Sequence, residues 1–243
     1  MHSLELTFVG TGNAFAPGGL CWNGFVANRR ILFEAPPTAL MALHRVGIDP
    51  NDIDAVVVSH HHGDHFLGLP SLLLHWKYMG RTRPVTIVGP IGTEALTRKI
   101  GEAVYPGLSE IAFDVHWVVA TAGRPVQIPG MTIEPVPVEH DSRLSASLGF
   151  ACDATGRRFG YTGDSRMCDA VLDLARTSEV LVSECASVAD TIPVHMNLLD
   201  DIPVVRAAMA PEAALLLTHI EPKVSAEGLA NTTVARDFET YRF

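Results

Sequence analysis

Hydrophobic and polar residues alternate along this chain with different spacings, and the spacing changes from one segment to the next. Strict alternation, as in residues 4–9, and short apolar runs, as in residues 55–58, predict β-strands. Longer mixed segments, such as residues 38–46 before Gly47, predict helices, and Thr38 is the expected N-cap of that helix. The expected strands are residues 4–9, 22–26, 30–33, 55–58, 85–88, 111–120, 131–138, 148–154, 158–161, 180–182 and 214–217. The expected helices are residues 38–46, 67–78, 93–102, 168–176, 201–209 and a last helix from Ser225 onward.

The order of these elements predicts the fold class. In both halves, strands come first as hairpins and then alternate with helices, which is typical of mixed sheets covered by helices. The run Val56-Val57-Val58 is apolar without interruption, as expected for a strand that is buried on both faces. Because no linker or repeat divides the chain, we expect one α/β domain over residues 1–243.

Composition and charge narrow the possible functions. With 47% hydrophobic residues the chain can build a large core, and it has no apolar run of the length that a membrane span needs. Its start lacks the pattern of a signal peptide and its four cysteines are scattered, so we expect reduced thiols and a cytoplasmic protein. The formal net charge of −9 disfavours binding of a long nucleic acid and makes a small anionic substrate the better partner.

The densest group of chemically active side chains lies directly after the apolar run of residues 55–58. Five of its side chains can bind a divalent cation: His60, His61, His62, Asp64 and His65. Neutral imidazole nitrogen and carboxylate oxygen are ligands that zinc and similar ions prefer. A His-rich surface tract is the alternative, but a predicted core strand and a predicted helix frame this loop, which favours a metal site.

Further candidate residues follow other apolar segments, where a rigid scaffold usually presents functional groups. Those at or just after the end of such a segment are His140, Asp164, Glu184 and His219. His195 lies a short loop after Glu184. Taken singly, each would more often be an ordinary partly buried residue, but together with the first cluster they form a coherent pattern.

This pattern resembles the metallo-β-lactamase superfamily. A strand that ends at Ser59 is followed by His-x-His-x-Asp-His, then by a distant His, an Asp and a last His, in the family's order. The resemblance covers essentially the whole chain and implies a four-layer αββα sandwich of two mixed sheets, with the metal site at one edge. It implies a first metal ion on His60, His62 and His140. It implies a second ion on Asp64, His65 and His219, with Asp164 bridging both.

Within the superfamily, the chain is similar to ribonuclease Z and its small relatives. Four segments carry this similarity: residues 4–12, 65–70, 161–165 and 217–220. By position, the similarity implies that Glu184 and His195 assist proton transfer near the scissile phosphate, and that the protein forms a homodimer. The interval between His140 and Asp164 is too short for the arm with which ribonuclease Z binds tRNA. The family's Asp-Cys-Gly-Glu segment is also replaced here, by residues 34–37, so we expect a different substrate.

These features predict a dinuclear metal-dependent hydrolase, and most directly a phosphodiesterase in which a metal-bridging hydroxide attacks a small phosphodiester. Asp64 would orient or deprotonate the water, and His195, positioned by Glu184, would stabilise the developing charge or protonate the leaving oxygen. Zinc fits the ligands, and manganese or iron also accepts them. Three alternatives stay open: an arylsulfatase or carboxylic ester hydrolase with the same ligands, a ribonuclease Z-like RNA endonuclease, and a non-catalytic metal- or RNA-binding module.

The remaining histidines and the large aromatic residues are expected to have structural roles. His61 stands at the variable position of the motif and is expected to point away from the metals. Packed or surface positions are expected for His44, His75 and His116. Core packing is the better explanation for the aromatic side chains that could also line a pocket, namely Trp22, Phe66 and Trp76.

Overall fold

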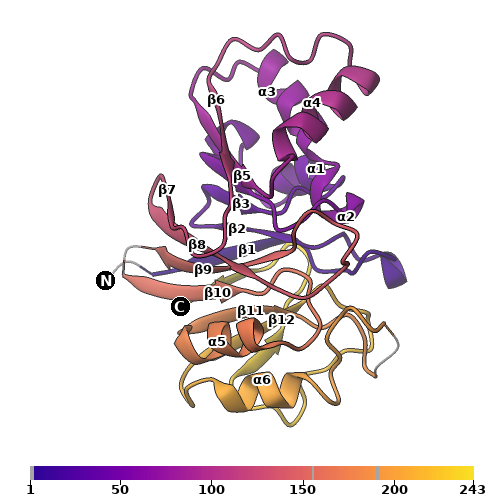
Figure 1. Ribbon diagram of the computed structural model, residues 1–243, viewed down its shortest axis with the longest axis vertical. Coiled ribbons are helices and arrows are strands. Elements are labelled where there is room, and N and C mark those ends of the chain that lie inside the picture. The colour runs from indigo at the N-terminus through magenta and orange to yellow at the C-terminus, as the bar shows by residue number, and fades with distance from the viewer. Residues whose placement is uncertain (1–2, 155, 190–191) are drawn as a thin grey trace.

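The computed structural model describes residues 3–154, 156–189 and 192–243. Over these residues the chain forms two seven-stranded mixed sheets that face each other, and helices cover the outer face of each sheet (Figure 1). The upper half in Figure 1 carries the N-terminal sheet and the lower half the C-terminal one. This arrangement confirms the predicted αββα sandwich.

The elements have the following bounds. The first sheet consists of β1 (Glu5–Gly10), β2 (Gly24–Ala27), β3 (Ile31–Phe33), β4 (Ala55–Val57), β5 (Val85–Gly89), β6 (Val115–Val119) and β14 (Thr240–Arg242). The second consists of β7 (Val126–Ile128), β8 (Met131–Pro137), β9 (Leu148–Ala154), β10 (Arg157–Tyr161), β11 (Val180–Glu184), β12 (Ala214–Thr218) and β13 (Thr232–Val234). The helices are α1 (Ala39–Arg45), α2 (Gly63–Phe66), α3 (Leu69–Tyr78), α4 (Thr93–Val104), α5 (Asp169–Thr177) and α6 (Ile202–Ala208), with single 3₁₀ turns at η1 (Pro17–Gly19) and η2 (Pro50–Asp52).

Strand direction decides where the site is built. The strand order is β14-β1-β2-β3-β4-β5-β6 in the first sheet and β13-β12-β11-β10-β9-β8-β7 in the second. Strands β3 to β6 run parallel to one another, as do β10 to β13. Because parallel strands end at the same edge of a sheet, the segments after β10, β11 and β12 emerge together. Every predicted site residue except His140, which follows β8, lies at or beyond the end of β4, β10, β11 or β12.

Aromatic rings fill the space between the two sheets. Phe25 stacks on Phe33 with ring centroids 4.7 Å apart, and Phe33 meets Phe159 of the opposite sheet edge-on at 5.7 Å. Two further apolar layers join the first sheet to α1 and α3 and the second to α5 and α6. In β4, Ala55 belongs to the central core and Val56 to the outer one, which confirms the predicted burial of both faces.

The last predicted helix is wrong. From Ser225 onward the chain forms turns and the short strands β13 and β14, which extend the second and the first sheet respectively. Gly228 and Asn231 adopt positive φ angles of 82° and 48°, which a right-handed helix does not allow. The β-branched residues Thr232 and Thr233 that follow favour an extended strand.

Smaller differences concern helix starts and a short edge strand. Thr38 stands at the N-cap of α1 but its hydroxyl makes no capping bond, because its backbone is already helical, with φ −84° and ψ −7°. Strand β7 has no counterpart among the predicted strands. Within the described ranges, no helix is long and apolar enough to cross a membrane.

Candidate functional site

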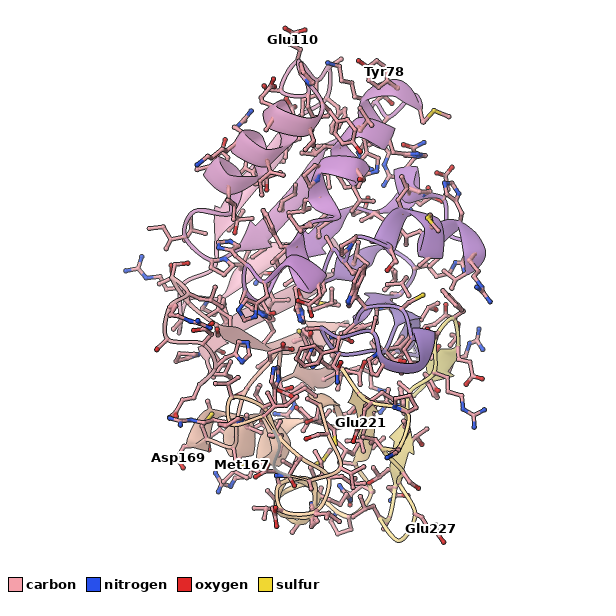
Figure 2. The ribbon with its side chains drawn as sticks, turned by 90° about the vertical axis from the view of Figure 1, so that its right-hand side faces the viewer. Tyr78, Glu110, Met167, Asp169, Glu221 and Glu227 are labelled. Atoms are coloured by element: carbon pink, nitrogen blue, oxygen red, sulfur yellow. The ribbon has the colours of Figure 1, made fainter. Side chains whose placement is uncertain are left out.

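The predicted site residues converge at one edge of the sandwich, between the two sheets. This edge lies beside α2 on the right of Figure 1 and faces the viewer in Figure 2. The chain leaves β4 in extended form and turns at Gly63 into α2, which carries Asp64 and His65. On the opposite sheet, Gly163 adopts φ 58° just after β10, and a Cβ there would lie 2.4 Å from the Leu148 carbonyl oxygen. A glycine is therefore required at the turn that brings Asp164 into the cluster.

Three histidines form the first part of the cluster. His62 Nδ1 lies 3.1 Å from His60 Nε2 and 3.1 Å from His140 Nε2, so three ring nitrogens point at one another. The outward nitrogens of the other two rings have partners: His60 Nδ1 lies 2.8 Å from Ser59 Oγ, and His140 Nδ1 donates to the Val194 carbonyl at 3.0 Å. These contacts fix which nitrogen each ring directs inward.

A second group lies next to the first. The carboxylate oxygen Asp64 Oδ2 is 3.1 Å from His65 Nε2 and 3.5 Å from His219 Nε2. His219 follows β12 with φ 52°, a left-handed conformation that is rare outside glycine and is typical of functional sites. The end of β12 and helix α2 thus hold this group from opposite sheets.

Asp164 lies between the two groups. Its Oδ2 atom is 3.2 Å from His65 Nε2 and 3.3 Å from His219 Nε2. The same atom is 3.8 Å from His60 Nε2 and 4.0 Å from His140 Nε2. One buried carboxylate oxygen therefore contacts ligand atoms of both groups, the position expected of a bridging ligand.

Burial and neighbouring charges shift the protonation of the cluster. Complete burial lowers the pKa of His60 well below its ordinary value. Burial would do the same to His65, but the carboxylates of Asp164, Asp64 and Glu34 raise the pKa of His65 well above its ordinary value. Burial likewise opposes ionisation of Asp164, yet the imidazoles of His219 and His65 hold its pKa well below the ordinary value. Asp164 is therefore ionised, and its carboxylate faces ring nitrogens of both groups.

The donor atoms fit divalent cations. Asp64 Oδ2, Asp164 Oδ1, His65 Nε2 and His219 Nε2 are buried, and none of them makes a well-aligned hydrogen bond among the described residues, although Asp64 Oδ2 lies 3.1 Å from His65 Nε2 and 3.5 Å from His219 Nε2. An unpaired buried polar atom costs about 1–3 kcal/mol, so a group of them indicates a missing partner such as an ion. Five sets of three ligand atoms lie within 4.8 Å of one another among the described residues, and two of them share no residue with each other and leave Asp164 between them: His60, His62 and His140, and Asp64, His65 and His219. Either set could hold a metal ion such as zinc, manganese or iron.

His195 and Glu184 form a pair beside this cluster. Glu184 Oε1 lies 2.9 Å from His195 Nδ1 and accepts a second hydrogen bond from the Ser165 amide at 2.6 Å. The His195 ring stacks on that of His219, with centroids 5.1 Å apart and an interplanar angle of 22°. Burial opposes its protonation, but Glu184 raises the pKa of His195 to about 9. The burial of Glu184 raises the pKa of that carboxyl.

Sequence reasoning did not assign two acidic residues that support the cluster. Glu34, fully buried after β3, has its Oε1 3.5 Å from His65 Nδ1, and it accepts hydrogen bonds from the Tyr161 hydroxyl at 2.9 Å and the Ser59 amide at 3.2 Å. Asp141 Oδ2 lies 3.4 Å from His62 Nε2. Glu34 carried a usable signal, because it follows an apolar strand just as the other site residues do.

His61, Phe66 and Trp76 lie outside the cluster, as expected, whereas Trp22 is only partly buried and not packed in the core as expected. His61 Nε2 lies 2.8 Å from Thr93 Oγ1, so its ring is engaged on the far side of the loop. Phe66 and Trp76 are buried in the core beside the first sheet. The aromatic side chain that lines the site is instead Phe15, on the loop between β1 and β2.

A pocket of about 470 Å³ opens onto the cluster. It is lined by Asn13, Ala14, Phe15, His62, His140, Asp141, Ser142, Arg143, Asp164, Arg166, Ala186, Ile192, Val194, His195 and His219. Its volume is in the range of sites for small molecules. A larger hollow of about 800 Å³ lies beside β13 and the C-terminal segment, away from these histidines.

Comparisons with known proteins agree with this geometry. The model of the family described as "Beta-lactamase superfamily domain" matches residues 29–220. Ribonuclease Z of Methanosarcina acetivorans is 24% identical over 275 residues, which cover 90% of this chain and 88% of that protein.

Solved structures match over the full length. The metallo-β-lactamase fold protein YhfI from Bacillus subtilis superimposes with a TM-score of 0.80 at 19% identity and covers 100% of both chains. A diphosphatase from the PhnP family superimposes with a TM-score of 0.75 at 20% identity, covering 100% of this chain and 98% of that one. The chain belongs to the metallo-β-lactamase superfamily of metal-dependent hydrolases.

Proposed function

We propose that this protein is a phosphodiesterase that holds two divalent metal ions and acts on small phosphodiesters. The observation that carries the proposal is the position of Asp164 Oδ2, which lies within 4.0 Å of ring nitrogens from both ligand groups. A carboxylate placed in this way is able to bridge a pair of cations. One ion would be held by His60, His62 and His140. The other would be held by Asp64, His65 and His219.

The metal pair would supply Lewis acidity and lower the pKa of water from about 15.7 to about 7. Zinc is the ion that we propose, because it favours imidazole and carboxylate ligands, and manganese or iron would also be accepted. Asp64 would orient the attacking water through its carboxylate. Glu184 raises the pKa of His195 to about 9, which favours the protonated ring, and this ring would donate a proton to the leaving oxygen. Glu184 would hold the His195 ring in place.

The rim of the pocket suits a small anion better than a long polyanion. Arg143 and Arg166 both line it, but each guanidinium is paired with a carboxylate, that of Asp141 and Glu139 respectively. The paired arginines can orient one phosphate group through their remaining N–H groups without creating a broad positive surface. The net charge of −9 for the whole chain also disfavours binding of a long polyanion.

Turnover of bis(p-nitrophenyl) phosphate tests the proposed function. Protein reconstituted with zinc or manganese should release p-nitrophenolate, and chelator-treated protein should not. Absence of turnover from fully metallated protein would overturn the phosphodiesterase proposal. Assays on p-nitrophenyl sulfate, p-nitrophenyl acetate and a precursor tRNA would then separate the sulfatase, carboxylic ester hydrolase and ribonuclease alternatives.

Replacement of Asp141 by alanine should weaken metal binding by about 10–100-fold, the usual cost of losing a carboxylate that orients a histidine ligand. The physical reason is the 3.4 Å contact between Asp141 Oδ2 and His62 Nε2, which directs Nδ1 of that ring into the cluster. Glu139→Ala is the matched control, because Glu139 binds Arg166 as Asp141 binds Arg143. The measurement is a zinc titration in competition with a chromophoric chelator. Equal affinities for the two variants would contradict the role of Asp141.

A further inference from the structure

Phe15 lies on the wall of the same pocket, although three quarters of its side chain is exposed. Its relative exposure is 75%, the highest value among the large hydrophobic residues of the described chain together with Met41. A single exposed apolar residue is unremarkable by itself. Here, however, the exposed ring shares a pocket with Asp164 and His219 of the cluster.

The backbone around Phe15 is firmly held. The side chain of Asn13 is buried; its Oδ1 accepts a hydrogen bond from the Phe15 amide at 3.1 Å, and its Nδ2 donates to the Ala186 carbonyl at 2.9 Å. Trp22 Nε1 donates to the Ala14 carbonyl at 3.0 Å, which closes the loop from its other end. This loop is drawn in indigo and projects at the right of Figure 1. An apolar ring is thus presented to the pocket by a fixed backbone, which reduces the entropic cost of binding against it.

The rest of the pocket lining is also divided between apolar and charged residues. Ile192 and Val194 add apolar surface, while Arg143 and Arg166 lie on the rim. A ligand that fits this pocket combines an anionic group for the histidine cluster with an apolar, flat group for Phe15. Aromatic rings stack on exposed phenylalanine in this way, and the stacking is tolerant of ring identity because every such ring has a π-face.

We propose that Phe15 determines substrate specificity by stacking on a flat aromatic group of the phosphodiester. This inference rests on the proposed function and names the substrate class: phosphodiesters that carry a nucleobase or an aryl ring, in preference to purely aliphatic ones. Both ring types offer the same stacking chemistry. A nucleobase lies farther from phosphorus than an aryl ring that is bonded to the phosphoryl group. The experiment therefore uses one ligand pair with each spacing.

The test is calorimetric binding of two matched ligand pairs to the zinc-loaded protein. One pair is 5′-AMP and ribose 5-phosphate, in which a hydroxyl at C1 replaces the base; the other is phenylphosphonate and cyclohexylphosphonate, which differ in the flatness of the ring. We expect at least one aromatic ligand to bind about tenfold more tightly than its aliphatic partner, equivalent to about 1.4 kcal/mol. In Phe15→Ala this preference should fall to about twofold or less, and in Phe15→Trp it should be retained.

Tyr78→Ala is the control, because Tyr78 is also an exposed aromatic residue but lies at the far upper end of the molecule in Figure 2. The pair whose ratio depends on Phe15 identifies the ring as a nucleobase or an aryl group. An unchanged ratio in Phe15→Ala, or no aromatic preference in the unsubstituted protein, would overturn the inference. Because the measurement is binding, this failure is distinct from failure of the proposed function, which bis(p-nitrophenyl) phosphate turnover reports.

Discussion

Replacing Asp164 with alanine should remove bound metal and reduce turnover of bis(p-nitrophenyl) phosphate by at least about 10³-fold. The Oδ2 atom of Asp164 lies 3.2 Å from His65 Nε2 and 3.8 Å from His60 Nε2, so its loss takes a ligand from both proposed ions at once. The loss of metal affinity should exceed the roughly 10–100-fold expected for Asp141→Ala, because a ligand itself is removed. Metal content after dialysis against a weak chelator, measured by atomic emission, checks the prediction.

Two further variants make the Asp164 experiment interpretable. Asp169→Ala removes an exposed carboxylate from the first turn of α5, five positions after Asp164 in the sequence, and should leave metal content unchanged. Asp164→Asn keeps the shape of the side chain but loses its charge, so it should bind metal more weakly than the unsubstituted protein while folding normally. Thermal melting of the metal-free proteins verifies folding. If Asp164→Ala retained both ions, Asp164 would not be the bridge.

Much of the fold could be predicted because the chain's local patterns agree with its tertiary structure. The uninterrupted valines of β4 indicate burial on two faces, and the structure places Ala55 and Val56 in different cores. The prediction failed after Ser225, where β13 pairs with β12, 17 positions earlier, and β14 pairs with β1 near the other end of the chain. Such pairing is not encoded in local periodicity. The positive φ of Asn231, which interrupts the predicted helix, likewise depends on the turn in which this residue lies.

The candidate site could be predicted residue by residue where a resemblance supplied the pattern. The structure brings each predicted ligand within 4.0 Å of at least one other, although His140 and His219 follow different strands of the second sheet. The supporting residues were harder to find. Asp141 is one position after His140, yet nothing in the sequence reveals that it contacts His62. Phe15 lies three positions after the segment 4–12 that carries the family similarity, but only the fold of its loop brings it to the pocket.

Replacing His195 with alanine should lower kcat by about 10²–10⁴-fold, the range for loss of a positioned general acid. Metal content should stay unchanged, because Nδ1 of His195 is occupied by Glu184 at 2.9 Å and lies 4.0 Å from Asp164 Oδ2. Atomic emission on the same samples measures metal content. Loss of an ion from His195→Ala would instead make His195 a ligand, a role that its closeness to His140 and Asp164 also permits.

The pH dependence separates a proton donor from a residue that only packs. Glu184 raises the pKa of His195 to about 9, so the donating form persists at neutral pH and is lost as the pH rises through about 9. The value of kcat/KM should therefore fall on the alkaline side, and His195→Ala should lack this fall. Glu184→Gln removes the charge that raises the pKa and should move the fall to lower pH. Glu179→Gln, which alters a partly buried carboxylate that pairs with Arg157 just before β11, should leave the profile unchanged. An identical alkaline limb in the unsubstituted protein and Glu184→Gln would mean that His195 does not supply the proton.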